Sequence, residues 1–145
     1  MEGRVKVPLT GQTKDEILAE LVQLVAADIA PGAAGPILEA VRDREREMTT
    51  GFGGGIAIPH GRTPAVDGLG IAAGVTRVPV EYDAVDGKPV RIVFLLVGPE
   101  TAAGEHVRTL ARVARLLHRA DVRDALLRAP DVADFVRVIR QAEAA

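Results

Sequence analysis

Two histidines and one arginine are the side chains of this chain whose types and spacing best suit chemistry. His60 follows the short apolar segment 56–58 and Pro59, and the proline ring fixes the backbone that presents the imidazole. His106 falls in the first turn of a helix that we expect after the apolar run 92–97. Because ligands of open α/β sheets bind beyond the carboxyl ends of strands, both imidazoles point to one region.

The chemistry that these residues favour is the handling of an anion by a neutral imidazole. A helix N-terminus offers free amide donors and a positive partial charge, which attract a phosphate and disfavour a protonated His106 ring. A neutral imidazole is a nucleophile. Arg44 ends a predicted helix just before the glycine-rich segment that leads to His60, where a guanidinium could bind phosphate through two hydrogen bonds.

Each of these residues also has an ordinary structural interpretation, which the sequence leaves open. His60 could be a satisfied core or surface residue, His106 a helix-surface residue, and Arg44 the ion-pair partner of Asp43, Glu45 or Glu47. His118 lies 12 residues after His106 on the same predicted helix, hence about 18 Å along its axis and on a different face. We expect His118 to complement the charge of the helix C-terminus.

Neither a metal nor a cofactor is expected from the sequence. The chain has no Cys and no His-Glu-x-x-His motif, so a zinc site would need carboxylates from elsewhere to join the two histidines. The glycine-rich segment 51–55 lacks the third glycine of the dinucleotide fingerprint and a following Gly-Lys-Ser/Thr. We interpret it as a loop whose glycines let the backbone pass close to a bound group or a docking partner.

Composition excludes several other classes of protein. The 145 residues, 48% of them apolar, predict a single soluble domain over residues 1–145. Cys, Ser, Asn and Trp are absent, which excludes serine and cysteine hydrolases, disulfide scaffolds and thiolate metal sites. A net charge of -2 and scattered aromatic residues argue against nucleic acid as a partner. No apolar run approaches the roughly 20 residues that span a bilayer, so we expect no membrane insertion and a cytoplasmic location.

Two helices are predicted in the N-terminal part of the chain. A capping box begins at Thr13 and precedes apolar residues at helical spacing, which predicts an amphipathic helix over residues 14–27. A second helix is expected from about residue 35, with one buried apolar face and an exposed charge run, 42–47. The glycine loop then leads into a short strand, 56–58, which stops just before His60.

Strands and then helices are predicted in the remainder. Residues 70–78 and 90–97 favour strands, and the unbroken apolar run of the second suits burial on both faces. Asp121 and Asp131 are the expected N-caps of two short C-terminal helices. Before them a long helix is predicted over 104–119, with an inner stripe of Val107, Leu110, Val113, Ala114 and Leu117. Helices that bracket several short strands imply an α/β sandwich around a mostly buried sheet.

Three stretches of the chain carry a family resemblance. They are Arg44-Glu45 with the later run Thr-Thr-Gly-Phe-Gly-Gly-Gly-Ile-Ala-Ile-Pro-His that ends at His60, then Tyr82-Asp-Ala-Val-Asp-Gly-Lys-Pro-Val, and His106-Val-Arg-Thr-Leu-Ala-Arg-Val-Ala. Over a core of about residues 9–140, the chain resembles the fructose/mannitol-type (type 2) IIA domain of the bacterial phosphotransferase system, most of all its nitrogen-regulatory subtype. Val107 and the pair Gly61-Arg62 depart from the residues usual in the family.

The resemblance implies a fold, a reaction and partners. The fold would be a mixed sheet of about five strands with helices on both faces. His60 would be the phosphorylated histidine, and His106 and Arg44 would stabilise the phosphoryl group without a metal or cofactor. The donor would be an HPr-like histidine phosphocarrier, and the acceptor a IIB domain or a regulatory target protein.

Two functions therefore stay open at this point. The chain could be a nitrogen-regulatory-type carrier that relays phosphate or signals by its phosphorylation state, or a sugar-transport IIA component that passes phosphate to a IIB domain. A domain that has lost the chemistry and a metal-dependent hydrolase that uses the same histidines are further alternatives. The sequence does not determine which imidazole nitrogen of His60 reacts, or whether Arg62, Asp86 or Glu105 contributes.

Overall fold

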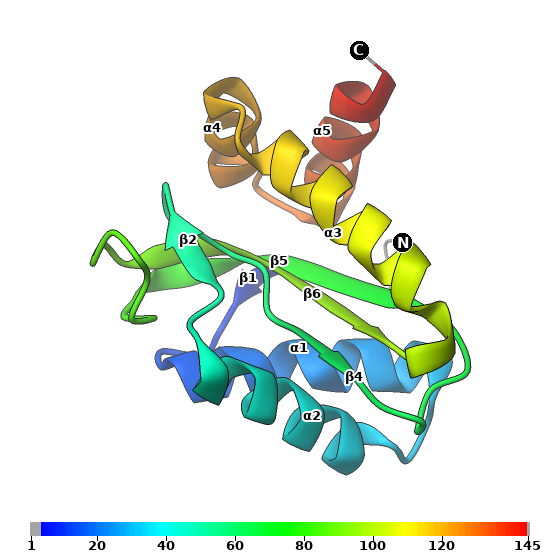
Figure 1. Cartoon of the computed structure of the whole chain (residues 1–145). Coiled ribbons are helices and arrows are strands. Elements are labelled where there is room, and N and C mark those ends of the chain that lie inside the picture. The colour runs from blue at the N-terminus through cyan, green and yellow to red at the C-terminus, as the bar shows by residue number, and fades with distance from the viewer. Residues whose placement is uncertain (1–3, 145) are drawn as a thin grey trace.

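A mixed β-sheet lies between two layers of helices in this protein (Figure 1). The structure, a computed structural model, describes residues 4–144. Across that range the sheet has six strands in the order β1-β5-β6-β3-β2, with β4 also paired to β6. The strands are β1 (Val5–Leu9), β2 (Gly51–Gly53), β3 (Ile56–Ala57), β4 (His60–Arg62), β5 (Gly70–Val80) and β6 (Val90–Gly98).

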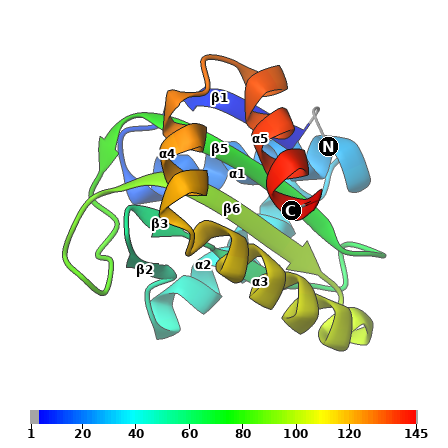
Figure 2. The ribbon, with the colours of Figure 1, turned by 90° about the horizontal axis from the view of Figure 1, so that it is seen from above.

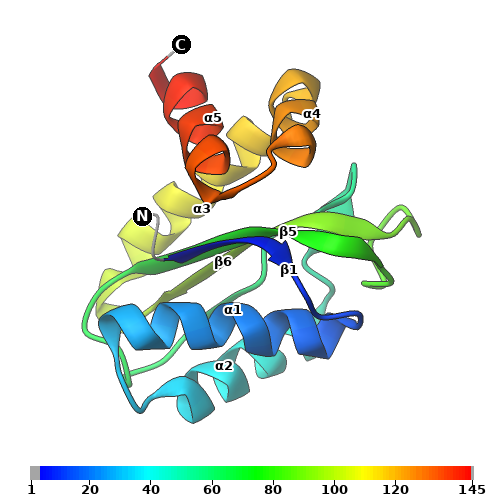
Figure 3. The same ribbon diagram turned by 180° about the vertical axis from the view of Figure 1, so that it is seen from behind.

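The helices cover both faces of this sheet. Helices α1 (Lys14–Ile29) and α2 (Ala34–Glu47) lie under one face, as the view from behind shows (Figure 3). The opposite face is covered by α3 (Ala103–Leu117), α4 (Ala120–Arg128) and α5 (Val132–Ala144), which are seen from above in Figure 2. A short 3-10 turn, η2 (Glu100–Ala102), leads from β6 into α3. The predicted α/β sandwich is confirmed, with six strands in place of about five.

Two apolar cores form where the helices press on the sheet. Leu21 and Val25 of α1 pack with Val93 and Leu95 of β6 on one face. On the other face, Phe94 of β6 stacks on Phe135 of α5 with ring centroids 5.8 Å apart. Strand β6 thus faces apolar side chains on both sides, as its unbroken apolar run predicts.

The glycine-rich segment is a hairpin, whereas we expected a loop. Gly51–Gly53 forms β2 and pairs antiparallel with β3. Gly53, Gly54 and Gly55 all have positive φ, which glycine adopts at little cost, and Gly54 and Gly55 form the turn between the two strands. Gly51 is a strand residue rather than a loop residue. It is a glycine because the strand passes close to Tyr82, where a Cβ at Gly51 would lie 2.9 Å from the ring.

Strands β3 and β4 follow one another along the same side of β6. Ile56 pairs with Ile92 and, after the interruption at Pro59, His60 pairs with Leu96, both in parallel. The N–H of Leu96 donates to the Pro59 carbonyl over 3.0 Å, so Pro59 keeps the chain against β6. His60 follows the short strand β3, as expected, and it also begins a further strand, β4, which was not expected.

Three further expectations about the helices are wrong. Val107 is 56% exposed and His106 takes its place on the inner face of α3, so the predicted stripe is displaced there by one residue. Helix α4 begins at Ala120, and Asp121 is not its N-cap but binds the preceding Arg119. The charge run of α2 is not wholly exposed either, because Glu45 is buried.

The local capping predictions fare better. The capping box at Thr13 is present in full: the Thr13 hydroxyl accepts the Glu16 N–H, and the Glu16 carboxylate accepts the Thr13 N–H. Asp131 accepts the N–H of Asp134 over 2.9 Å, as expected of the cap of α5. Within residues 4–144, none of the helices has the length and apolar character needed to cross a membrane.

Candidate functional site

His60 is held by the segment that precedes it. Its Nδ1 lies 3.0 Å from the carbonyl oxygen of Ile58, two residues earlier. A carbonyl only accepts, so Nδ1 carries the hydrogen and donates it. The other ring nitrogen, Nε2, then keeps its lone pair in the neutral ring. The backbone therefore fixes both the orientation and the tautomer of His60.

The surroundings of His60 favour the neutral ring. Burial lowers its pKa below the ordinary value, and the positive charges of Arg44 and Arg62 lower the pKa further. The hydrogen bond to Ile58 and the charge of Glu45 oppose these effects without overcoming them. His60 is thus neutral and nucleophilic at neutral pH.

His106 packs edge-on against His60 from the first turn of α3. The two ring centroids are 5.6 Å apart and the ring planes are inclined by 68°. His106 is 1% exposed, and neither of its ring nitrogens has a hydrogen-bond partner among residues 4–144. Burial, with the adjacent His60 ring, which would repel a second proton, and the Arg62 guanidinium, lowers the pKa of His106 to about 4. A buried neutral ring with both nitrogens unpaired is suited to receive a polar group that arrives at His60.

Arg44 lies in the last turn of α2 and shares a pocket with His60. The guanidinium donates to the carbonyl oxygen of Met48 over 2.9 Å. Arg44 forms no ion pair with Asp43, Glu45 or Glu47 in the described part of the chain, so the alternative interpretation of this residue is not observed. The pocket measures about 300 Å³ and is lined by Arg44, Thr49, Thr50, Phe52, Ile58, His60, Leu110 and Ala114.

The close approach of α2 to β4 brings Arg44 near His60. Gly61, directly after His60, lies against the backbone of α2, and a Cβ there would meet the Val41 nitrogen at 3.0 Å. Only a residue without a side chain allows this spacing. Gly61 therefore has a structural role in the assembly of the site.

Sequence reasoning missed part of the lining of this pocket. Thr49 and Thr50 line it with His60, and the buried Glu45 carboxylate accepts hydrogen bonds from Thr50. Two consecutive threonines directly before a glycine turn were the available signal. Glu45 offered none, since its place in a run of charges is typical of an exposed helix end.

The remaining candidates separate into near and distant residues. Arg62 is two residues after His60 on β4, so both side chains project from the same face of the strand. A guanidinium nitrogen of Arg62 lies 3.5 Å from a carboxylate oxygen of Glu100. Asp86 instead accepts the N–H groups of Gly54 and Lys88, which ties the glycine hairpin to the next loop.

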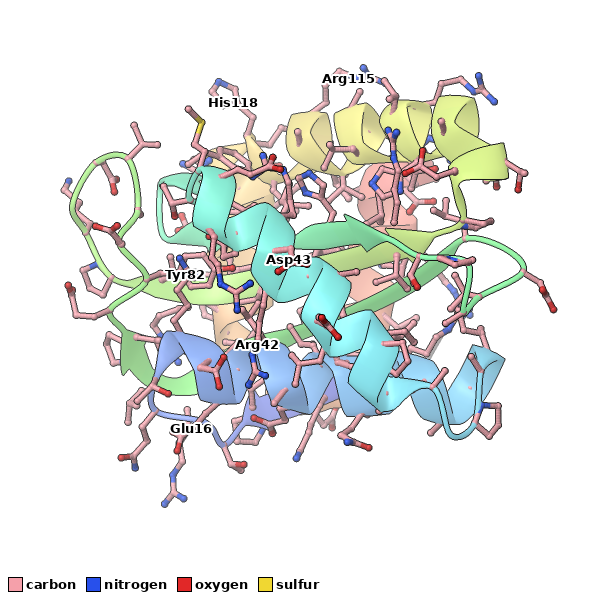
Figure 4. All side chains as sticks on the ribbon, turned by 60° about the horizontal axis from the view of Figure 1, so that its bottom comes forward. Glu16, Arg42, Asp43, Tyr82, Arg115 and His118 are labelled. Carbon is pink, nitrogen blue, oxygen red and sulfur yellow. The ribbon has the colours of Figure 1, made fainter. Side chains whose placement is uncertain are left out.

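Two further residues of α3 lie away from the pocket. Glu105 is exposed on the first turn of the helix and does not line the site. His118 is the C-cap of α3, and Figure 4 shows it pointing outward at the edge of the molecule together with Arg115. Of the three histidines, only His60 and His106 therefore come together.

The site combines a nucleophilic nitrogen, a neutral hydrogen-bonding ring and a guanidinium. Among residues 4–144, no three His, Cys, Asp or Glu side chains are grouped so that they could hold a metal ion. The donor set of His60, His106 and Arg44 suits a tetrahedral oxyanion on His60, because Arg44 and a ring N–H of His106 can both donate to its oxygens.

Comparisons with known proteins show which family the chain belongs to. The family model of the phosphoenolpyruvate-dependent sugar phosphotransferase system, EIIA 2, matches residues 2–142. A nitrogen regulatory protein of Pseudomonas aeruginosa is 39% identical over 137 residues, which cover 94% of this chain and 89% of that protein. The fructose-specific EIIABC component of Bacillus subtilis is 31% identical over 137 residues, 94% of this chain but only 22% of that longer protein.

A solved structure shows the same fold. The crystal structure of the nitrogen regulatory protein IIA-Ntr from Neisseria meningitidis matches with a TM-score of 0.88 and 30% identity. The match covers 96% of this chain and 94% of the other. The extent of the family match and the identity to the Pseudomonas protein lead to one conclusion: this chain belongs to the EIIA 2 family of the phosphoenolpyruvate-dependent sugar phosphotransferase system.

Proposed function

We propose that this protein is a phosphoryl carrier that accepts a phosphoryl group on Nε2 of His60 from a histidine phosphocarrier. The observation that carries the proposal is the hydrogen bond from His60 Nδ1 to Ile58, which leaves Nε2 as the free nucleophile. Within the described part of the chain, neither ring nitrogen of the adjacent His106 has a hydrogen-bond partner, and Arg44 lines the pocket that contains His60.

The proposed step is an in-line transfer between two imidazoles. The lone pair of His60 Nε2 forms a bond to phosphorus while the N–P bond of the donor breaks, and that electron pair returns to the donor ring. The positive charge that develops on the His60 ring is stabilised by the Ile58 carbonyl, because Nδ1–H already donates to it. The equatorial oxygens of the phosphoryl group receive hydrogen bonds from Arg44 and His106.

Exposed apolar residues around the pocket support a protein as the donor. Phe52, which lines the pocket, is 43% exposed, and Val107, next to His106, is 56% exposed. Met48, whose carbonyl binds Arg44, is 67% exposed. Apolar side chains rimmed by polar ones are typical of surfaces that dock another protein.

A regulatory role is the form of this function that the comparisons support best. The relative with 39% identity is a nitrogen regulatory protein, and the similarity extends over 89% of that protein. In this form the phosphoryl group on His60 changes which target protein the surface binds. The second candidate is a transport component that passes phosphate to a IIB domain, which the 31% identity to a fructose-specific EIIABC component favours.

Nitrogen-15 and phosphorus-31 NMR of the phosphorylated protein tests the proposed atom. We expect a phosphorus coupled to Nε2 of His60 and a retained Nδ1–H resonance. Phosphorus on Nδ1 would refute the proposed geometry. Adding a IIB domain of the fructose class then separates the two roles: rapid loss of phosphate to IIB supports transport, and a phosphorylated protein that persists supports regulation.

A further inference from the structure

Glu45 is a buried carboxylate that the proposed chemistry does not use. It lies in the last turn of α2, next to Arg44 in the chain, and its side chain is 6% exposed. The Lys14 ammonium lies 2.8 Å from one carboxylate oxygen. The same carboxylate accepts the backbone N–H of Thr50 over 2.9 Å and also the Thr50 hydroxyl. The Glu45 carboxylate therefore binds both hydrogen-bond donors of Thr50, its backbone N–H and its hydroxyl.

Tyr82 completes this buried group. Its hydroxyl lies 3.2 Å from a Glu45 oxygen and 3.0 Å from the Thr50 hydroxyl oxygen. The Lys14 ammonium lies 4.5 Å from the centre of the Tyr82 ring, a cation–π distance. Burial also raises the pKa of Tyr82, so its hydroxyl remains a donor. The group joins α1, α2, the segment before β2 and the loop after β5.

The carboxylate of Glu45 is charged despite its burial. Burial alone would raise the pKa of Glu45, but hydrogen bonds from Lys14 and from the Thr50 side chain and backbone outweigh it and lower the pKa below the ordinary value. A buried charge of this kind is costly unless it is fully paired. Its retention beside the pocket calls for a role that an apolar residue of similar size would not fill.

Hydrogen bonds connect Glu45 to His60 in three steps. Glu45 holds Thr50, and the Thr50 carbonyl accepts the N–H of Ile58 over 3.1 Å. The Ile58 carbonyl in turn accepts Nδ1–H of His60 over 3.0 Å. Glu45 therefore positions Thr50, Thr50 positions Ile58, and the Ile58 carbonyl determines the tautomer of His60.

We propose that Glu45, with Lys14 as its counter-ion, is a positioning residue for phosphoryl transfer at His60. It holds Thr50 and, through Thr50, the Ile58 carbonyl that orients the His60 ring with Nε2 free. It also anchors the last turn of α2, from which Arg44 extends into the pocket. The inference rests on the proposed function of His60.

The substitution Glu45→Gln tests this role, because it keeps the shape of the side chain and removes its charge. The matched control is Asp15→Asn, which breaks the Asp15–Arg42 ion pair of 2.7 Å between α1 and α2 but has no contact with Thr50. Figure 4 shows Arg42 on the α1 side of α2. Both variants lose an ion pair between the same two helices, so an effect that comes only from loosening α1 from α2 would appear in both.

Two readouts separate positioning from stability. In Glu45→Gln we expect the maximal rate of phosphoryl acceptance to fall about tenfold or more, with the KM for the donor within about twofold of wild type, because the reacting nitrogen is misoriented while the docking surface is intact. Asp15→Asn should keep both values. Nitrogen-15 shifts of His60 should show a measurable population of the Nε2–H tautomer in Glu45→Gln alone.

The tautomer of His60 is measured in the absence of a phosphoryl donor. Its result therefore tests the positioning role of Glu45 separately from the carrier function of His60. If wild type accepts no phosphate but Glu45→Gln still changes the His60 tautomer, the carrier function fails and the positioning stands. An unchanged tautomer and a wild-type rate in Glu45→Gln overturn the positioning role. Should that variant not fold, Thr50→Val replaces it: the hydroxyl contact to Glu45 is lost while Lys14 stays paired, and the same two readouts must change in the same direction.

Discussion

The imidazole of His60 on β4 meets that of His106 on α3 edge to face, with ring centroids 5.6 Å apart. Two protonated rings at this distance would repel one another, and burial lowers the pKa of both. The pair is therefore neutral at neutral pH. His60 can act as nucleophile, and His106 can supply an N–H to the group that arrives.

The neutral His106 makes the stability of the fold depend on pH. Its pKa is about 4 in the folded protein and 6.5 when unperturbed, so the unfolded chain binds the proton more readily. The stabilisation is complete above pH 6.5 and is lost as the pH falls towards 4, on the order of 3 kcal/mol. Urea unfolding at a series of pH values measures this slope. His106→Phe should reduce this dependence of the unfolding free energy on pH, leaving the smaller part due to His60, and an equal dependence in both proteins would show that His106 does not contribute.

Arg44 is predicted to act on the phosphoryl group rather than on the fold. Arg44→Gln should slow phosphoryl acceptance by His60 about tenfold or more, since a charge-assisted hydrogen bond is lost. The rate of Arg44→Lys should lie between those of wild type and Arg44→Gln, because the charge is kept but the paired donors are not. Rapid-quench kinetics followed by intact-mass analysis measures the rates. The control is Arg46→Gln on the same helix turn, where the arginine is exposed and pairs with Asp43. Similar rates in both glutamine variants would show that Arg44 does not stabilise the phosphoryl group.

Gly61 is predicted to set the distance between α2 and β4. In Gly61→Ala the new Cβ would meet the backbone of Val41 at about 3.0 Å, so α2 must shift and carry Arg44 with it. We expect the free energy of unfolding to fall by about 1–3 kcal/mol, with slower phosphoryl acceptance. A Cβ at Gly35 in α2 meets nothing within 4 Å among the described residues, so Gly35→Ala should cost less than about 1 kcal/mol, a cost that comes only from the proline that follows it. Equal stability of the two variants would contradict this packing.

Much of the fold follows from local patterns in the sequence. The capping box at Thr13 fixes the start of α1 because its hydrogen bonds join residues only three apart. The apolar run of β6 predicts a central strand because only burial on both faces accommodates it. The convergence of His60 and His106 also follows, since both residues lie beside the carboxyl-terminal half of β6.

The features that the sequence did not show depend on distant partners. Strand β4 has the sequence His-Gly-Arg, which carries no apolar alternation, and it pairs because β6 offers its edge. Glu45 is buried because Lys14 and Tyr82, 31 positions before and 37 after it, meet its carboxylate. His106 displaces Val107 from the inner face of α3 against hydropathy, which is typical of a polar residue retained for chemistry.

Intact-mass analysis of the protein after incubation with phosphoenolpyruvate, the general phosphotransferase enzyme and a histidine phosphocarrier tests the carrier function most directly. Wild type, His60→Ala and His106→Ala are measured side by side. We predict that wild type gains a single acid-labile phosphoryl group, His60→Ala gains none, and His106→Ala gains it more slowly because a donor to the phosphoryl oxygens is lost. No gain by wild type with competent donors, or an equal gain by His60→Ala, would contradict phosphoryl transfer through His60.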